Sequence, residues 1–292
     1  MDLDLRKLRY FVAVADQLNF RRAAEHLHIA QPVLSRQIRA LEDDLKVQLF
    51  VRDHRETRLT AAGEQLKADA GPLLTDAGAL QRRLARAARG TTTFTVAFMP
   101  GLTVSEPVRR LREQHPGLAV DVLRTDWGSQ TDVLHDGRAD VSFVRRPLDP
   151  DRLTVRPLFT EPRVAMLLAR HPLAGRRSLR LADLAGETLL QDPAAVPEWL
   201  ALAGDRPAPA VRLRPRTVEE KLEHVAAGQG FVLLPRSAAT HYRRPDVAAL
   251  RVSDLGPTEV CLAWVASRRS RLIIEFAALA EGVTSRSTAP RG

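Results

Sequence analysis

The 292-residue sequence predicts an α/β protein with a mainly helical head, a long linking helix and two α/β lobes. Three observations predict this organisation. Apolar residues recur at helical spacing in the first part and as heptads in the second, whereas strand-like and helix-like segments alternate in the third. We expect these parts at residues 1–59, 60–89 and 90–292, with lobe I at about 90–160 and 267–292 and lobe II at about 161–266.

The head is expected to contain three helices and a hairpin. The first helix carries its apolar face on Leu5, Leu8, Phe11, Val12 and Ala15. Asn19 suits the N-cap of a second helix, and Gln31-Pro32 marks the start of a third, because proline is favoured in a first helical turn. Residues 49–51 and 57–59 flank a polar turn, as in a small hairpin. This order is typical of a winged helix-turn-helix.

The third helix has the features of a recognition helix. Its buried stripe of leucine and isoleucine leaves Gln31, Ser35, Arg36 and Arg39 on other faces. Amide, hydroxyl and guanidinium groups hydrogen-bond base edges and phosphates, and Pro32 would contact bases by shape. Side chains suited to the phosphate backbone are Arg21, Arg22, Arg52, Arg55 and Arg58. The head is therefore predicted to bind double-stranded DNA, with Arg36 as the strongest single candidate.

The linking helix is predicted to be a dimerisation element. A heptad seam with polar residues outside it indicates pairing with a second copy or packing on the head, and we favour a homodimer. Gly71-Pro72 interrupts the seam, and a proline inside a helix is expected to bend its axis. The seam consists of Leu66, Ala70, Leu73, Ala77, Leu80, Leu84 and Ala87.

From residue 90 the chain is expected to form two lobes with mainly parallel sheets. Residues 93–144 alternate as a βαβαβ unit, and a second α/β series follows, including a strand at Val211-Arg212-Leu213-Arg214. Parallel sheets bind ligands beyond the carboxyl ends of their strands. The loops after Met99, Arg124 and Val144 are therefore expected to border a ligand cleft.

Eight residues are candidates for binding a small, anionic effector in this cleft. Gly101, Leu102 and Thr103 are expected to open a helix, whose N-terminus would suit an anion. Trp127 would line the cleft or pack in the core, with Gly128 and Ser129 at the next helix start. Arg145 could hold a carboxylate bidentately. Thr217 would be either an N-cap or a ligand donor.

Composition excludes several other classes. The net charge is +9, but residues 1–60 hold 11 Lys+Arg against 9 Asp+Glu, so overall basicity is poor evidence for DNA binding. One cysteine, Cys261, closes no intrachain disulfide, and the histidines lack metal-ligand spacing, so we expect no metal and no cofactor. Without a long apolar run or a secretory signal, a cytoplasmic, nucleoid-associated protein is expected, with no membrane contact.

The head resembles that of the LysR-type transcriptional regulators along LNFRRAAEHLHIAQPVLSRQI at 18–38 and LTAAG at 59–63. FMP at 98–100, HPL at 171–173 and VAAGQGFVLLP at 225–235 are similar to the family's effector domain. The resemblance implies a promoter-binding dimer, usually paired into tetramers, whose two Rossmann-like lobes resemble periplasmic binding proteins and sense a small molecule. The sequence has Arg21 where the family commonly has Thr or Ser.

Two other hypotheses stay open beside a ligand-responsive regulator. An enzyme built on the two lobes has little support, because no GxSxG, Walker or GxGxxG pattern follows a strand. A ligand-independent architectural DNA-binding protein would show no stabilisation by any small molecule. We therefore expect no enzymatic activity.

Overall fold

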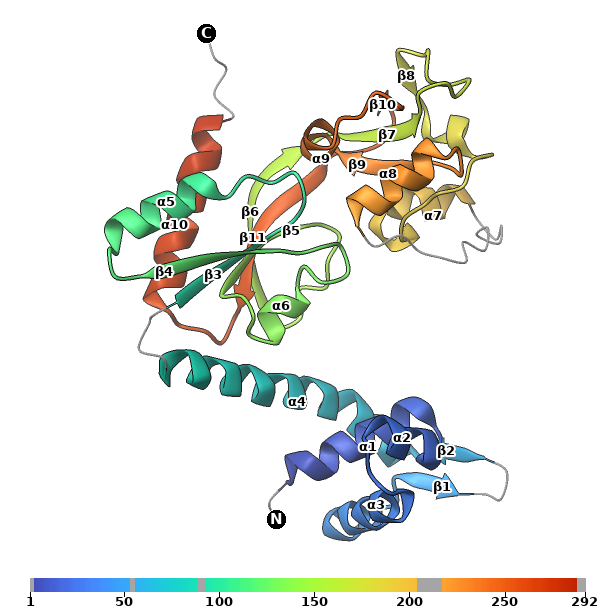
Figure 1. The fold of residues 1–292 in the computed structure, drawn as a ribbon, viewed down its shortest axis with the longest axis vertical. Helices are drawn as coiled ribbons and strands as arrows, with labels where there is room; N and C mark the ends of the chain where they lie inside the picture. Colours follow the sequence, from blue (N-terminus) through green and yellow to red (C-terminus); the bar gives the residue numbers. More distant parts are fainter. Residues whose placement is uncertain (1–2, 53–55, 89–92, 204–216, 288–292) are drawn as a thin grey trace. The chain divides into compact units, whose positions relative to one another are not determined.

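The computed structural model describes residues 3–52, 56–88, 93–203 and 217–287. The chain forms two compact units, residues 1–84 and 85–292. Figure 1 shows the first unit as a cluster of short helices with a hairpin and one long helix, and the second as two sheets flanked by helices. Within the described residues, no helix is both long enough and apolar enough to cross a membrane.

The head has the predicted three helices and hairpin. Asn19 caps α2, because its Oδ1 accepts the N–H groups of Arg21 and Arg22 at 3.0 Å. Pro32 occupies the first turn of α3, and β1 and β2 pair antiparallel. The elements are α1 (Leu5–Gln17), α2 (Phe20–His26), α3 (Gln31–Leu45), β1 (Phe50–Arg52) and β2 (Thr57–Leu59). Their shared core includes Phe11, Val14, Leu34, Ile38 and Leu41.

A single helix, α4 (Ala61–Ala88), follows the wing and passes through Pro72 as continuous helix. Thr60 fixes its start: its hydroxyl donates to the Gln48 carbonyl at 2.7 Å and accepts the Gly63 N–H at 3.0 Å. A Cβ added at Gly63 would lie 2.2 Å from the Leu49 carbonyl oxygen, so only glycine allows this close packing.

The predicted heptad seam of α4 is divided between burial and exposure. Ala70 is buried and Leu66 packs against the head core. Leu73, Leu80 and Leu84 are 42%, 51% and 61% exposed, although leucine is normally buried. Their spacing leaves an apolar stripe along the helix.

Lobe I is a five-stranded sheet in the order β4-β3-β5-β11-β6 with helices on both faces. β3, β4 and β5 are parallel, as the βαβαβ prediction requires, and β11 and β6 add antiparallel. Helices α5 and α10 pack together over one face, and α6 lies against the other (Figure 1). The elements are β3 (Thr93–Phe98), α5 (Ser105–Gln114), β4 (Ala119–Arg124), α6 (Asp132–His135), β5 (Val141–Arg145), β6 (Leu153–Glu161), β11 (Thr258–Val265) and α10 (Arg271–Ser287).

Lobe II is a four-stranded sheet in the order β8-β10-β7-β9. Alternate residues of β7 face two different cores: Ala165 and Leu167 pack with the 3-10 turns, and Met166 packs with α8 and α9. The elements are β7 (Arg163–Leu168), β8 (Ser178–Leu179), η1 (Leu181–Leu184), η2 (Pro193–Ala195), α7 (Pro197–Ala203), α8 (Val218–Ala226), β9 (Val232–Pro235), α9 (Arg236–His241) and β10 (Val247–Val252).

The structure corrects three sequence predictions. Strand β11 pairs with β5 and β6, so the chain returns to lobe I by Thr258 and not after residue 266. The sheet of lobe II is mostly antiparallel, because β7 pairs antiparallel with both of its neighbours. The predicted helix start at Gly101–Thr103 is also wrong, since α5 begins at Ser105. The strand predicted at 211–214 lies outside the described residues.

Candidate DNA-binding surface and effector cavity

The outward face of α3 carries the predicted base-contacting residues together. Gln31, Pro32, Arg36 and Arg39 are exposed, and Ser35 is half-buried. The opposite face is anchored in the head core through Leu34, Ile38 and Leu41. This anchoring fixes the orientation of the polar face, because a helix held along one side cannot rotate without exposing apolar area. The first half of α3 therefore presents amide, hydroxyl and guanidinium groups on one surface.

Most of the arginines on this surface are free to meet an anion. Within the described residues, the side chains of Arg22, Arg36 and Arg39 have no ion pair. Arg21 lies 3.9 Å from Glu25, and Arg58 lies 3.3 Å from Glu56; such exposed pairs are weak and break readily. The side chain of Arg52, and all of Arg55, lie outside the described part of the chain.

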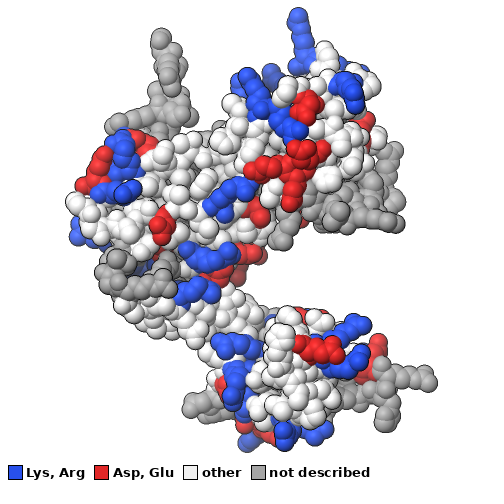
Figure 2. Space-filling view, in the orientation of Figure 1, with Lys and Arg blue, Asp and Glu red and all other residues white. Residues whose placement is uncertain are grey.

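Local chemistry, and not overall charge, distinguishes this surface. Basic and acidic side chains lie side by side on the face that Figure 2 shows, on both units. The N-terminus of α3 has no side-chain cap, because its N-cap residue is Ala30. Its first N–H groups and the positive end of the helix dipole are thus available to a phosphate oxygen.

In the second unit, a cavity of about 90 Å³ lies where the two lobes meet. The ends of β3, β4 and β5 reach it through Met99, Arg124 and Arg145, which are the three strand ends that the sequence pointed to. Lobe II contributes Thr217, Val218 and Lys221 from the start of α8, and further residues from β9 and α9. Both lobes therefore form the walls of one cavity.

Three of the eight predicted effector residues line this cavity: Trp127, Arg145 and Thr217. Thr217 is also a true N-cap, since its hydroxyl accepts the Glu220 N–H at 3.1 Å in a capping box. The ring of Trp127 packs partly against the lobe I core, so it both lines the cavity and supports it.

The other five predicted residues have different surroundings, and none lines the cavity. Leu102 is buried in the lobe I core and Thr103 is exposed. A Cβ at Gly101 would lie 2.4 Å from the Ala238 nitrogen, so this glycine permits close packing of the lobes. Ser129 donates its N–H and hydroxyl to Asp126 Oδ1, and Gly128 lies beside it in the same turn. The N–H at this position is therefore already used.

Arg145 is held by the protein itself. It is buried, and its Nε and Nη2 donate to Glu161 Oε1 at 3.1 and 3.0 Å. It also donates to the Pro100 carbonyl and to the Ser237 hydroxyl, each at 3.0 Å. Burial lowers the pKa of Arg145, and Glu161 opposes this by stabilising the charged form. Its guanidinium thus joins the lobes at the cavity edge and is not the free carboxylate ligand that the sequence suggested.

The sequence prediction missed Lys221, which is a cation facing the same cavity. Within the described residues its ammonium has no ion pair, although Asp126, Asp192 and Glu220 act on it electrostatically. Burial lowers the pKa of Lys221 below its usual 10.5, and these carboxylates oppose the shift. Lys221 stands one helical turn after the N-cap Thr217, and this spacing in the sequence could have identified it.

The remaining cations of the cavity have carboxylate partners. Arg124 of lobe I reaches Glu219 of lobe II at 2.9 Å. Arg146 lies 2.8 Å from Glu259, and Arg163 is paired with Glu198. Lys221 therefore differs from its neighbours, because it retains its positive charge for a bound molecule.

A winged helix-turn-helix joined to a two-lobed unit with a cavity defines a DNA-binding regulator with a ligand-binding domain. A family model described as "Bacterial regulatory helix-turn-helix protein, lysR family" matches residues 5–64. A second, described as "LysR substrate binding domain", matches residues 87–284. The chain belongs to the LysR family of DNA-binding transcriptional regulators.

Relatives resemble the chain over almost its whole length. The HTH-type transcriptional regulator BudR of Raoultella terrigena is 32% identical over 94% of this chain and 99% of its own. The small neutral protease regulatory protein of Streptomyces coelicolor is 35% identical over 96% of this chain and 86% of its own. The structure of full-length CbnR complexed with its target DNA has a TM-score of 0.57 and 26% identity, covering 96% of this chain and 99% of that one.

Proposed function

We propose that this chain is a promoter-binding LysR-type regulator whose α3 reads the major groove and whose interlobe cavity binds a small anionic effector. The observation that carries the effector class is Lys221, an ammonium without an ion pair among the described residues in a cavity where the other cations are paired. An anion in the cavity gains from this charge at low water exposure.

For DNA, the free side chains of Arg36 and Arg39 and the uncapped start of α3 support major-groove and phosphate contacts. CbnR, whose structure contains its target DNA, has the same overall fold and supports this use of the head. A footprint on the intergenic DNA beside the chain's own gene tests the proposal. Protection that weakens steeply with salt is expected, and a complete lack of protection at low salt contradicts it.

For the effector, the sharpest test is calorimetry with a panel of small carboxylates and phosphate esters. At least one is expected to bind the full chain, and Lys221→Gln is expected to weaken it about tenfold, since one charge-assisted hydrogen bond contributes roughly 1.5 kcal/mol. The matched control is Lys67→Gln in α4, outside the effector unit, which is expected to leave affinity unchanged. Equal affinity for the wild type and Lys221→Gln would contradict an anion at this site.

We also propose that α4 pairs with α4 of a second copy, and that two such dimers form a tetramer on DNA. The exposed stripe of Leu73, Leu80 and Leu84 supports the pairing. Leu80→Asp together with Leu84→Asp is expected to convert the dimer to monomer in sedimentation velocity. Exposed Leu3→Asp serves as the control. Unchanged sedimentation of the double variant would show that α4 is not the dimer interface.

The proposed protein senses its ligand and does not transform it. Its only cysteine, Cys261, is buried in β11, and burial raises the pKa of this thiol to about 11, so it stays protonated and a poor nucleophile at neutral pH. We expect it to act in the cytoplasm, at the nucleoid, where promoter DNA lies. Turnover of any cavity ligand by the purified chain would contradict this part of the proposal.

A further inference from the structure

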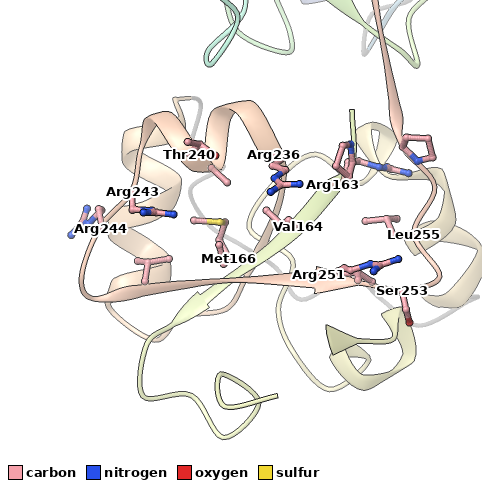
Figure 3. A pocket seen from close by; sticks show the side chains of 16 residues that line it. Arg163, Val164, Met166, Arg236, Thr240, Arg243, Arg244, Arg251, Ser253 and Leu255 are labelled. Atoms are coloured by element: carbon pink, nitrogen blue, oxygen red, sulfur yellow. The ribbon is translucent and has the colours of Figure 1, made fainter. Parts of the chain in front are cut away.

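A second and larger hollow lies on lobe II, on the outer side of α9. It has a volume of about 790 Å³, which is within the usual range for small-molecule pockets. We call it the lobe II groove; Figure 3 shows the side chains that line it. Arg163 is the one residue that it shares with the interlobe cavity, and its remaining lining comes from β7, α9, β10 and the loop after β10.

The groove exists because the helices of lobe II cover only part of the sheet. Helix α9 is six residues long and packs over β7 and β9, leaving the face of β10 open. Ala249 lies opposite Met166 in the β10–β7 pair, and Arg251 lies opposite Val164. A small residue at 249 thus opens a recess whose floor is apolar: Val164, Met166, Val247 and Ala249.

Five arginines line the recess, and no acidic residue does. Arg163 is paired with Glu198, and Arg244 with Glu223 and Asp246. Within the part of the chain that the structure describes, the guanidinium groups of Arg236, Arg243 and Arg251 have no hydrogen bond or ion pair. Lobe II therefore has carboxylates for some arginines of the groove and leaves three charges over one apolar floor.

The unpaired arginines surround the floor. Figure 3 shows Arg236 and Arg243 along α9, on one side of Val164 and Met166, and Arg251 on the strand below them. Arginine binds a carboxylate or phosphate through two parallel hydrogen bonds, and an apolar floor favours the organic part of the same molecule. The chemistry of the groove matches a ligand with an anionic group on an apolar body.

We propose that the lobe II groove is a second ligand site, which binds a small amphipathic organic anion such as a substituted aryl carboxylate. This site is separate from the interlobe cavity, and the proposal does not depend on what that cavity binds. Its ligand lies on α9, whose Ser237 N–H donates to Glu161 at 2.9 Å and whose hydroxyl accepts from Arg145. Binding at the groove thus acts on the helix that joins the two lobes.

The three methionines of the chain allow the two sites to be observed separately. Met166 lies in the groove, Met99 lines the interlobe cavity, and Met1 is the third. The full chain with ¹³C-methyl methionine is titrated with 4-tert-butylbenzoate, its neutral amide, and inorganic phosphate, at constant ionic strength. The carboxylate is expected to give a saturable shift of Met166 below about 10 mM, and the amide and phosphate are expected to bind at least tenfold more weakly.

Substitution then tests the charges. Arg236→Gln with Arg251→Gln is expected to weaken the Met166 titration at least tenfold, and exposed Arg170→Gln, elsewhere in lobe II, leaves it unchanged. Retained methyl shifts of Met99 verify the fold of the variants.

Four results would overturn the proposal. These are no saturable Met166 shift with the carboxylate, shifts confined to Met99, amide binding as tight as carboxylate binding, and phosphate binding as tight as carboxylate binding. A change of oligomeric state in the double variant with an unaltered Met166 titration would instead identify the groove as an interface between copies.

Discussion

The DNA-binding head and the effector unit present their functional side chains in opposite ways. In the head, Gln31, Ser35 and Arg36 lie within six consecutive residues of one helix and project outward from a packed core. In the effector unit, the cavity draws residues from both lobes, and Lys221 lies far along the chain from Trp127 and Met99. A convex surface on a helix needs only local order, whereas a cavity needs correct tertiary packing.

This comparison predicts that the effector unit depends more on buried polar contacts than the head does. Glu161→Ala would leave the Arg145 guanidinium buried without its carboxylate. Breaking a buried pair by removing one partner costs about 3–5 kcal/mol, and we expect a loss of this size in the free energy of unfolding of the second unit. Urea denaturation, followed by fluorescence of the tryptophans Trp127, Trp199 and Trp264, measures it.

The control for this prediction removes both charges. Arg145→Met with Glu161→Leu keeps similar volume and leaves no unpaired charge, so it is expected to cost less than Glu161→Ala alone. If the double variant is the less stable one, the pair contributes more than mutual neutralisation and the stated reason is wrong.

In the head, the largest expected stability effect is steric. Gly63→Ala places a Cβ 2.2 Å from the Leu49 carbonyl, where the wing meets α4. Overpacking of this kind costs roughly 1–3 kcal/mol, so thermal melting of the head should occur at a lower temperature. Gly71→Ala, whose Cβ would have no neighbour within 4 Å, is the matched control and should not destabilise the chain.

Specific DNA recognition is expected to fail with a single outward-facing side chain. Arg36→Ala should lower affinity for the operator about 10- to 100-fold, the range of one bidentate base contact, with melting unchanged. Exposed Arg9→Ala on α1 is the control. Fluorescence anisotropy with operator and scrambled DNA measures both, and equal losses on the two DNAs would indicate a phosphate contact for Arg36.

The smallest expected effect is a pH dependence of effector binding. Lys221 binds an anion in its charged form, and burial lowers its pKa below 10.5. Affinity should therefore be constant near neutral pH and fall as pH rises through this lowered pKa, with proton uptake on binding in that range. Calorimetry in buffers of different ionisation enthalpy measures the uptake. Lys221→Gln should remove the dependence, and a persisting dependence would point to another group.

Prediction from the sequence succeeded where the signal was local. The helical spacing of apolar residues and the caps at Asn19 and Thr217 gave the head helices and the start of α8. The βαβαβ unit was also found, because each strand and helix has its own period. Sequence reasoning placed β11 in the wrong lobe, since pairing with β5 and β6 depends on strands more than 90 residues away.

The candidate site divides along the same line. Trp127, Arg145 and Thr217 were identified because they follow strand ends or begin a helix. The occupation of Arg145 by Glu161 was invisible in the sequence, because it brings together two strand ends of different direction. The groove under Arg251 was equally hidden, since it results from the short length of α9 and from the register of Ala249 against Met166.

The sequence by itself determined the winged head, the linking helix, the strand ends at the cavity and membership of the LysR family. These depend on periodicity, capping and motif spacing, which act over a few residues. Only the tertiary structure decided which charges are neutralised and which remain free. Whether Lys221, Arg236 or Arg251 meets a carboxylate depends on which distant segments fold beside it, and for an exposed or partly buried cation that neighbour decides what it can bind.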